Sequence, residues 1–322
     1  MLHLYSRLVA ACTLLLIVAG AMVTSTGSGL AVPDWPTTYG YNMFTFPPSK
    51  WVGGILYEHG HRLIASTVGF LTIILAVWVW RVEPRAWVRR LGFLALAAVI
   101  VQGILGGLTV RFFLPAPISI GHAGLAQLFF CLTVSIALFT SRGWQQHYGR
   151  GPAVRDNGTL RKLTIATTAL IYFQILLGAT MRHTGAGLAI PDFPLAFGGL
   201  LPSHWDAGIA THFMHRVGAV VAGIMAIVTA AHVWSHHRDI RALVRPATLL
   251  VFLIAIQIAL GAFVVLTGRA VPVNSAHVAI GALVLVTSLV LTLRTYREQF
   301  PDATETDSPT NVATRPTPAT AA

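Results

Sequence analysis

Four histidines stand at matching places in the two halves of this chain and are its best candidates for chemistry. His61 and His122 are 61 residues apart, and His215 and His277 are 62 apart. All four fall within long apolar stretches, where an ionisable side chain usually faces the interior of a helical bundle and has a partner. Neutral imidazole is a good axial ligand for haem iron. The pattern therefore predicts two bis-histidine haem sites.

The residues around the first histidine of each pair differ in a way that suggests different roles. Glu58, His61 and Arg62 share one helix face, because they are three and four residues apart. In the second half His212 replaces the glutamate, while Arg216 matches Arg62. A carboxylate beside a haem can exchange protons, so we interpret the first site as reactive and the second as an electron carrier. Both arginines would then pair with haem propionates.

Simpler roles exist for the same residues. A membrane histidine can serve only as a hydrogen-bonding link between helices, Glu58 can form a plain ion pair with Arg62, and both arginines can pack at helix ends. Zinc is disfavoured, since each pair lacks further ligands of suitable type. His59 is expected to point away from His61. The two cysteines, Cys12 and Cys131, lie in apolar stretches and are expected to fill space.

The elements that position these residues are predicted to be membrane-spanning helices. The chain is 55% hydrophobic and only 10% charged, and its apolar stretches reach the roughly 20 residues that a helix needs to cross a bilayer. The stretches are continuous rather than alternating, which favours helices over a barrel. We expect spans near 8–26, 53–80, 91–110, 118–140, 162–182, 206–234, 246–266 and 274–293.

The basic residues indicate orientation rather than binding to nucleic acid. Sixteen lysines and arginines fall at one set of predicted helix ends and four, including Arg182 and Arg269, at the other. Cytoplasmic loops are enriched in Lys and Arg, so we expect a multi-pass protein of the cell membrane with both termini cytoplasmic. The segment after Phe300 is rich in Pro, Thr, Ala and Asp and is expected to be disordered.

An internal repeat relates the two halves. Residues 27–36 read GSGLAVPDWP and residues 185–194 read GAGLAIPDFP, with seven of ten positions identical. Each unit contains four predicted helices, so both copies have the same orientation in the membrane. We therefore predict an all-α integral membrane fold of eight transmembrane helices, arranged as two tandem four-helix bundles related by pseudo-two-fold symmetry. The expected units are 1–150, 151–298 and a cytoplasmic tail, 299–322.

Together these residues resemble the haem A synthase family over roughly residues 5–295. The resemblance rests on the TGSGLAVPDWP and TGAGLAIPDFP loops, the EHGHR segment and the four histidines. It implies oxidation of the C8 methyl of haem O to a formyl group, giving haem A for cytochrome oxidase. It also implies that His61 and His122 bind the substrate haem O beside Glu58. His215 and His277 would hold a haem b cofactor.

The resemblance further implies partners and leaves two alternatives to test. Haem O synthase, cytochrome oxidase assembly factors and membrane lipid are the expected partners, and a homo-oligomer is compatible with the sequence. Many family members carry a cysteine pair in an outer loop, which this chain lacks, so the route of the electrons is open. A bis-histidine dihaem electron-transfer cytochrome would need the same histidines, and a transporter built from repeats would need a polar path to both sides.

Overall fold

The computed structural model describes residues 1–145 and 158–297 of the chain. Within these ranges the protein consists of α-helices, three short 3-10 helices and connecting loops, with no β-strand. The long helices are α1 (Leu2–Ser25), α2 (Gly54–Val82), α3 (Ala86–Arg111), α4 (Ala116–Phe139), α6 (Thr159–His183), α7 (Ala207–His236), α8 (Arg241–Leu266) and α9 (Val271–Tyr296).

All eight long helices are long and apolar enough to cross a membrane, which confirms the predicted all-helical membrane fold. A further helix of one turn, α5 (Arg142–Gln145), follows α4. The expected tail, 299–322, and the expected boundary between the two units near residue 150 lie outside the described residues.

Several helices extend beyond the predicted spans. The third, expected over 91–110, begins at Ala86, and the eighth, expected over 274–293, ends at Tyr296. Apolar stretches mark only the segment inside the hydrocarbon layer. Beyond it the helix can continue, because long charged side chains reach into the interfacial water.

Hydroxyl side chains inside the helices bond to the backbone of their own helix. The Thr13 hydroxyl donates to the Val9 carbonyl at 2.8 Å, and Thr72 donates to Val68 at 2.7 Å. Lipid offers no partner for a hydroxyl, so this bond removes the cost of burying it. Polar residues of this kind therefore do not interrupt the spans.

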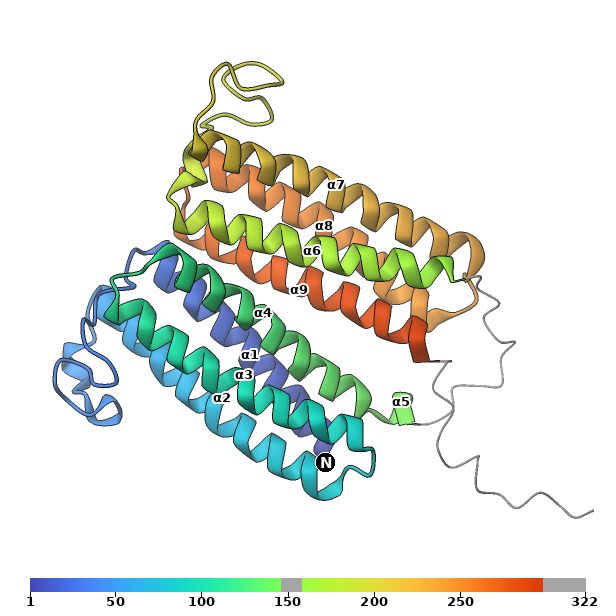
Figure 1. Cartoon of the computed structure of the whole chain (residues 1–322), viewed down its shortest axis with the longest axis horizontal. Coiled ribbons are helices and arrows are strands. Elements are labelled where there is room, and N and C mark those ends of the chain that lie inside the picture. Colours follow the sequence, from blue (N-terminus) through green and yellow to red (C-terminus); the bar gives the residue numbers. More distant parts are fainter. Residues whose placement is uncertain (146–157, 298–322) are drawn as a thin grey trace, which may run out of the picture.

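The first four long helices form one bundle, with α1 next to α2, α2 next to α3, α3 next to α4, and α4 next to α1 (Figure 1). In this ring α2 and α4 occupy opposite corners. Val9, Leu75 and Phe129 are fully buried where the helices meet. The helices that carry His61 and His122 thus face one another across the bundle rather than packing side by side.

The last four long helices, α6 to α9, form a second bundle with the same order of neighbours (Figure 1). Here α7 and α9 occupy opposite corners, and Leu250, Ala226 and Leu285 are buried between the helices. The helices that carry His215 and His277 therefore repeat the arrangement of the first bundle.

The bundles meet through two helices from each. Helix α1 packs against α9, and α4 packs against both α6 and α9. Phe130 and Ile17 from the first bundle lie against Ala282 and Val286 from the second. Exchanging α1 with α6 and α4 with α9 maps these contacts onto one another, as a two-fold axis requires. The pseudo-two-fold relation itself stays a prediction.

Candidate functional site

The four predicted ligand histidines all lie about two turns into their helices, at the end of the bundles where the long loops connect α1 to α2 and α6 to α7. His61 is within electrostatic range of His122, and His215 of His277. The helices of each pair are at opposite corners of their bundle, and the two histidines of a pair are still close enough to interact electrostatically.

Each of these imidazoles packs against a glycine on the neighbouring helix. A Cβ at that glycine would lie 2.8–3.3 Å from the Cε1 atom of the ring, closer than ordinary van der Waals contact. An added Cβ would force His215 to shift from its place against Gly178, and at the other three glycines the ring would have to yield by a few tenths of an ångström. The pairs are Gly20 with His61, Gly106 with His122, Gly178 with His215, and Gly261 with His277. The glycines also follow the repeat: Gly106 and Gly261 lie in apolar stretches that the sequence suggests as a slot beside the histidines, whereas the contacts of Gly20 and Gly178 emerge only from the helix packing.

The ring nitrogens show which atoms are available to a ligand. In His61 and His122 the Nδ1 atom is buried and has no hydrogen-bond partner among the described residues, whereas Nε2 is neither buried nor hydrogen-bonded. His215 Nδ1 lies 3.0 Å from Gln174 Nε2, which also donates to the His215 carbonyl at 2.7 Å. Nε2 is a common ligand atom for haem iron. His61 and His122 therefore fit a haem held by axial imidazoles. At His215 the Gln174 amide N–H donates to Nδ1, which leaves the ring proton on Nε2, so ligation through Nε2 would require the Gln174 amide oxygen to face Nδ1 instead.

The fourth histidine differs in its ring contacts. Nε2 of His277 lies 3.3 Å from Nε2 of Gln257 on α8. Iron coordination through His277 Nε2 would require this amide to move away. Gln102, the counterpart of Gln257, instead donates to the His122 carbonyl at 2.9 Å and leaves the ring nitrogens alone.

Glu58 and Arg62 connect α2 to the loop before it. The Glu58 carboxylate is only 3% exposed and accepts hydrogen bonds from the Val32 amide at 2.8 Å and from Arg62. The Arg62 guanidinium also donates to the carbonyls of Val32, Asp34 and Thr37 at 2.7–3.1 Å. All four terminal N–H groups of Arg62 are therefore used within the protein. The structure gives Arg62 the role of loop anchor.

The second bundle repeats this arrangement with different chemistry. His212, 2% exposed, accepts a hydrogen bond from the Ile190 amide at 3.2 Å, as Glu58 does from Val32. Arg216 donates to the carbonyls of Leu195, Ile190 and Asp192 at 2.6–3.1 Å. Like Arg62, Arg216 thus holds its loop. Propionate binding by these two arginines stays a prediction, and their observed contacts point elsewhere.

The aspartates of the repeated loops close tight turns. Asp34 accepts hydrogen bonds from the amides of Tyr39 and Gly40 at 2.7 and 2.9 Å, and Asp192 accepts them from Phe197 and Gly198. Partial burial would raise the pKa of Asp34, but the bonds from Gly40, Thr37 and Tyr39 outweigh it and the pKa is lowered. The Gly198 amide, followed by that of Phe197, lowers the pKa of Asp192.

His59 belongs to the core of the first loop. It is fully buried between the rings of Phe46 and Trp51, and its Nδ1 lies 3.2 Å from the Thr38 hydroxyl. It therefore lies apart from His61, as its sequence position predicts. No group of three or more His, Cys, Asp or Glu side chains suited to a metal ion occurs in residues 1–145 and 158–297.

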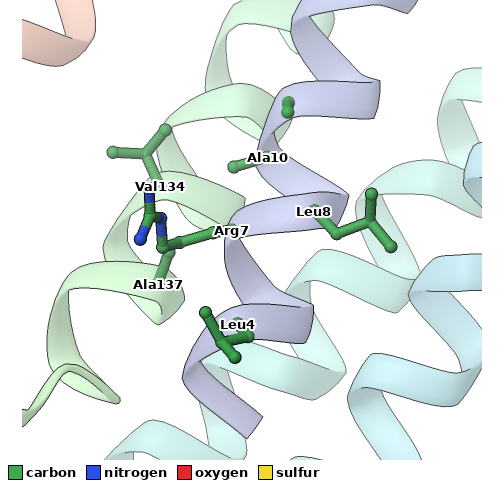
Figure 2. A pocket seen from close by; sticks show the side chains of 7 residues that line it. Leu4, Arg7, Leu8, Ala10, Val134 and Ala137 are labelled. Atoms are coloured by element: carbon green, nitrogen blue, oxygen red, sulfur yellow. The ribbon is translucent and has the colours of Figure 1, made fainter. Parts of the chain in front are cut away.

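Two hollows in the structure lie away from the four histidines. One, of about 600 Å³, is formed by α1 and α4 and is lined by Leu4, Arg7, Leu8 and mostly small apolar side chains (Figure 2). The other, of about 330 Å³, lies between α4, α6 and α9. Both are largely apolar grooves at the junction of helices, without paired ionisable groups, so we assign neither of them the chemistry.

The fold and the paired histidines define the class of this protein: a multi-pass helical membrane protein with two candidate porphyrin sites. Residues 49–290 match the family model COX15-CtaA, described as cytochrome oxidase assembly protein. The chain belongs to this family.

Curated relatives cover nearly the whole chain. A protein named heme A synthase from Halalkalibacterium halodurans is 30% identical over 291 residues, which is 89% of this chain and 94% of the relative. A heme A synthase from Shouchella clausii is 32% identical, covering 80% of this chain and 84% of its own length. One from Symbiobacterium thermophilum is 31% identical, with coverages of 77% and 80%.

Proposed function

We propose that this chain is a haem A synthase, an oxidoreductase that converts the C8 methyl of haem O to a formyl group for cytochrome oxidase. The observation that carries the proposal is the repeated pair of histidines on helices at opposite corners of a bundle, each imidazole against a glycine. Relatives of similar length that carry this name support it. They do not favour the alternative of a dihaem electron-transfer cytochrome.

The two sites are assigned different roles in this proposal. His61 and His122 hold haem O, and His215 and His277 hold haem b. The asymmetry at Glu58 supports this order, because the second bundle has His212 at the same place. When bound, iron and porphyrin supply the redox chemistry. The protein supplies axial ligands, an apolar surrounding and proton transfer.

Glu58 is the group proposed to move protons during the successive two-electron oxidations of the methyl group. Its carboxylate is on the same helix face as His61, and its orientation is fixed by Val32 and Arg62. A carboxylate held in this way can accept a proton from the reacting carbon substituent or from an attached hydroxyl. Arg62 is then a positioning residue, since its contacts are with Glu58 and the loop.

The cellular setting follows from the fold and the family. The protein spans the membrane several times, and we propose that both termini are cytoplasmic, because basic residues are concentrated at that end. Haem O synthase is the proposed supplier of substrate, and assembly factors of cytochrome oxidase are the proposed recipients of product. With no cysteine in either outer loop, the electrons are proposed to leave through the second haem.

Identification of the extracted haems tests the proposal. We expect cells that lack haem A, and that express this chain with a haem O synthase, to accumulate a porphyrin with the mass of haem A. The control is His61→Ala, which should leave haem O unconverted while the second site keeps its haem b. A coloured wild-type protein that yields haem b alone, with haem O unchanged in the same cells, would contradict the proposal and favour an electron-transfer cytochrome.

A further inference from the structure

Two arginines stand above the histidines of the second bundle, on the side of the loops. Arg182 follows Gly178, the glycine that contacts His215, by four residues, so it lies on the same face of α6 one turn further out. Arg269 lies just past the end of α8, eight residues beyond Gly261, which contacts His277. Arg182 therefore lies one turn above Gly178, and Arg269 lies beyond the end of α8 with its side chain against Gly187.

Neither arginine has a carboxylate partner in the described part of the chain, where the ion pairs are Glu58–Arg62 and Glu83–Arg85. Arg182 is half-buried and donates from Nη2 to the Ala21 carbonyl and the Ser25 hydroxyl of α1, at 2.9 and 3.0 Å. It is within electrostatic range of Arg269 and of His277. Two neighbouring cations at the edge of a membrane protein are costly unless an anion lies between or beside them.

The first bundle has no such charges at the equivalent places. Thr24 follows Gly20 by four residues, and Leu114 follows Gly106 by eight. The backbone at Leu114 and Arg269 is nearly the same, with φ of 60° and 66°. Leu114 packs against Gly29 as Arg269 packs against Gly187. The two bundles thus have the same local backbone and packing at Leu114 and Arg269 and differ there in charge.

We propose that Arg182 and Arg269 bind the propionate carboxylates of the macrocycle held by His215 and His277, which makes the second bundle the site of the retained cofactor. The inference rests on the proposed function. Arginine suits this role because its planar fork matches a carboxylate. Arg216, the earlier candidate, is engaged by loop carbonyls. The first bundle has Thr24 and Leu114 in place of the two arginines. It therefore lacks these propionate-binding groups and can exchange its haem.

The rate of haem loss from the second site tests this inference. The full-length protein is purified from cells without haem O synthase, in a His61→Ala background so that only the second site is filled. Transfer of haem b to excess apomyoglobin is then followed by absorbance. We expect Arg182→Gln and Arg269→Gln each to speed transfer about tenfold, the loss of one charge-assisted hydrogen bond. Both should also lower the midpoint potential, because a nearby cation favours the reduced haem. Arg111→Gln, an exposed arginine at the end of α3, is the matched control.

The outcomes separate this inference from the proposed function. If His277→Ala in the His61→Ala background retains a normal haem spectrum, these histidines do not form the second site, and the haem b assignment within the proposed function fails. If His277→Ala loses haem but the protein with both Arg182→Gln and Arg269→Gln releases haem at the wild-type rate, only the propionate-binding role of the two arginines is overturned. Arg182 also links α6 to α1, so Arg182→Gln can fail to fold. In that case Arg182→Lys and Arg269→Gln test propionate binding. The Arg269 side chain makes no protein hydrogen bond among the described residues, so its loss should leave the fold intact.

Discussion

At the scale of single residues, the protein uses the same contact twice with different side chains. Glu58 and His212 each accept the amide of the loop residue that leads into the Pro-Asp turn, at Val32 and Ile190. Both side chains therefore stabilise the loop that precedes their helix. What distinguishes Glu58 is a carboxylate on the same helix face as His61 that can carry a proton, and this difference argues for chemistry in the first bundle.

We expect Glu58→Gln to keep haem bound while lowering haem A formation at least 100-fold, because general acid–base groups contribute about 10²–10⁴ in rate. Glutamine retains an oxygen for the Val32 amide, so the loop should remain in place. The measurement is the ratio of haem A to haem O in extracts of co-expressing cells. Glu83→Gln, which changes the other buried glutamate paired with an arginine, is the control. A normal haem A yield from Glu58→Gln would remove Glu58 from the mechanism.

At the scale of elements, close approach of neighbouring helices fixes the ligands. Glycines on α1, α3, α6 and α8 leave room for the imidazoles on α2, α4, α7 and α9. A rigid surface on one side of each ring limits its rotation. Protein interiors adapt little to an added methyl group, so these positions should be intolerant of side chains.

Gly178→Ala is the sharpest test of this packing, because its Cβ would lie 2.8 Å from His215 Cε1. Overpacking costs about 1–3 kcal/mol, so we expect roughly tenfold or greater loss of haem b from the purified protein. Gly103→Ala is the control. No atom lies within 4 Å of the Cβ it would add, and it should leave haem content unchanged or slightly raise stability. Equal haem content in both variants would show that the contact between Gly178 and His215 does not hold the ligand in place.

The repeated loops should keep their turns to low pH. The folded pKa of Asp34 is below its ordinary value of 3.8, so its contribution to stability is complete above that value and is lost only as the pH falls through the lower, folded pKa. We expect the Tyr39 and Gly40 amides to stay protected from hydrogen exchange at pH 5, after correction for intrinsic rates. Asp34→Ala should remove that protection at every pH. Loss of protection in the wild type between pH 6 and 5 would contradict this account.

At the scale of the whole molecule, the two bundles meet through α1, α4, α6 and α9, and the histidine helices α2 and α7 lie outside this interface. The helices α4 and α9, which carry His122 and His277, touch directly. The shortest path between the proposed haem sites therefore runs through the interface of the bundles. This arrangement suits electron transfer from the first site to the second.

Orientation in the membrane is the prediction at this scale. With Cys12 and Cys131 replaced by Ala, Ser203→Cys in an outer loop should react with a membrane-impermeant maleimide in intact cells. Arg238→Cys, between α7 and α8, should react only after the membrane is broken. The physical reason is the sequence count of sixteen basic residues in the segments predicted to be cytoplasmic against four in the others. If only the Arg238→Cys variant reacts in intact cells, the orientation is the reverse of the one predicted.

The sequence by itself determined the eight membrane-spanning helices, their apolar spans and the repeat, and it singled out the four histidines as candidate ligands. These features are local or periodic: a span is set by its length in apolar residues, and a repeat by comparison of the chain with itself. The predicted spans were too short where helices such as α3 continue beyond the hydrocarbon layer, because hydropathy does not report backbone hydrogen bonding.

Only the tertiary structure decided which side chains meet. Diagonal placement of α2 and α4, the contact of Gly178 with His215, and the loop carbonyls around Arg62 all depend on how helices pack. An arginine near a histidine in sequence looked free to bind a propionate, yet its N–H groups are used by a loop some 30 residues earlier. Arg182 and Arg269, distant in sequence, lie instead at the loop ends of the helices whose glycines contact His215 and His277. Contacts between helices depend on rotation and approach, which sequence spacing along one helix does not specify.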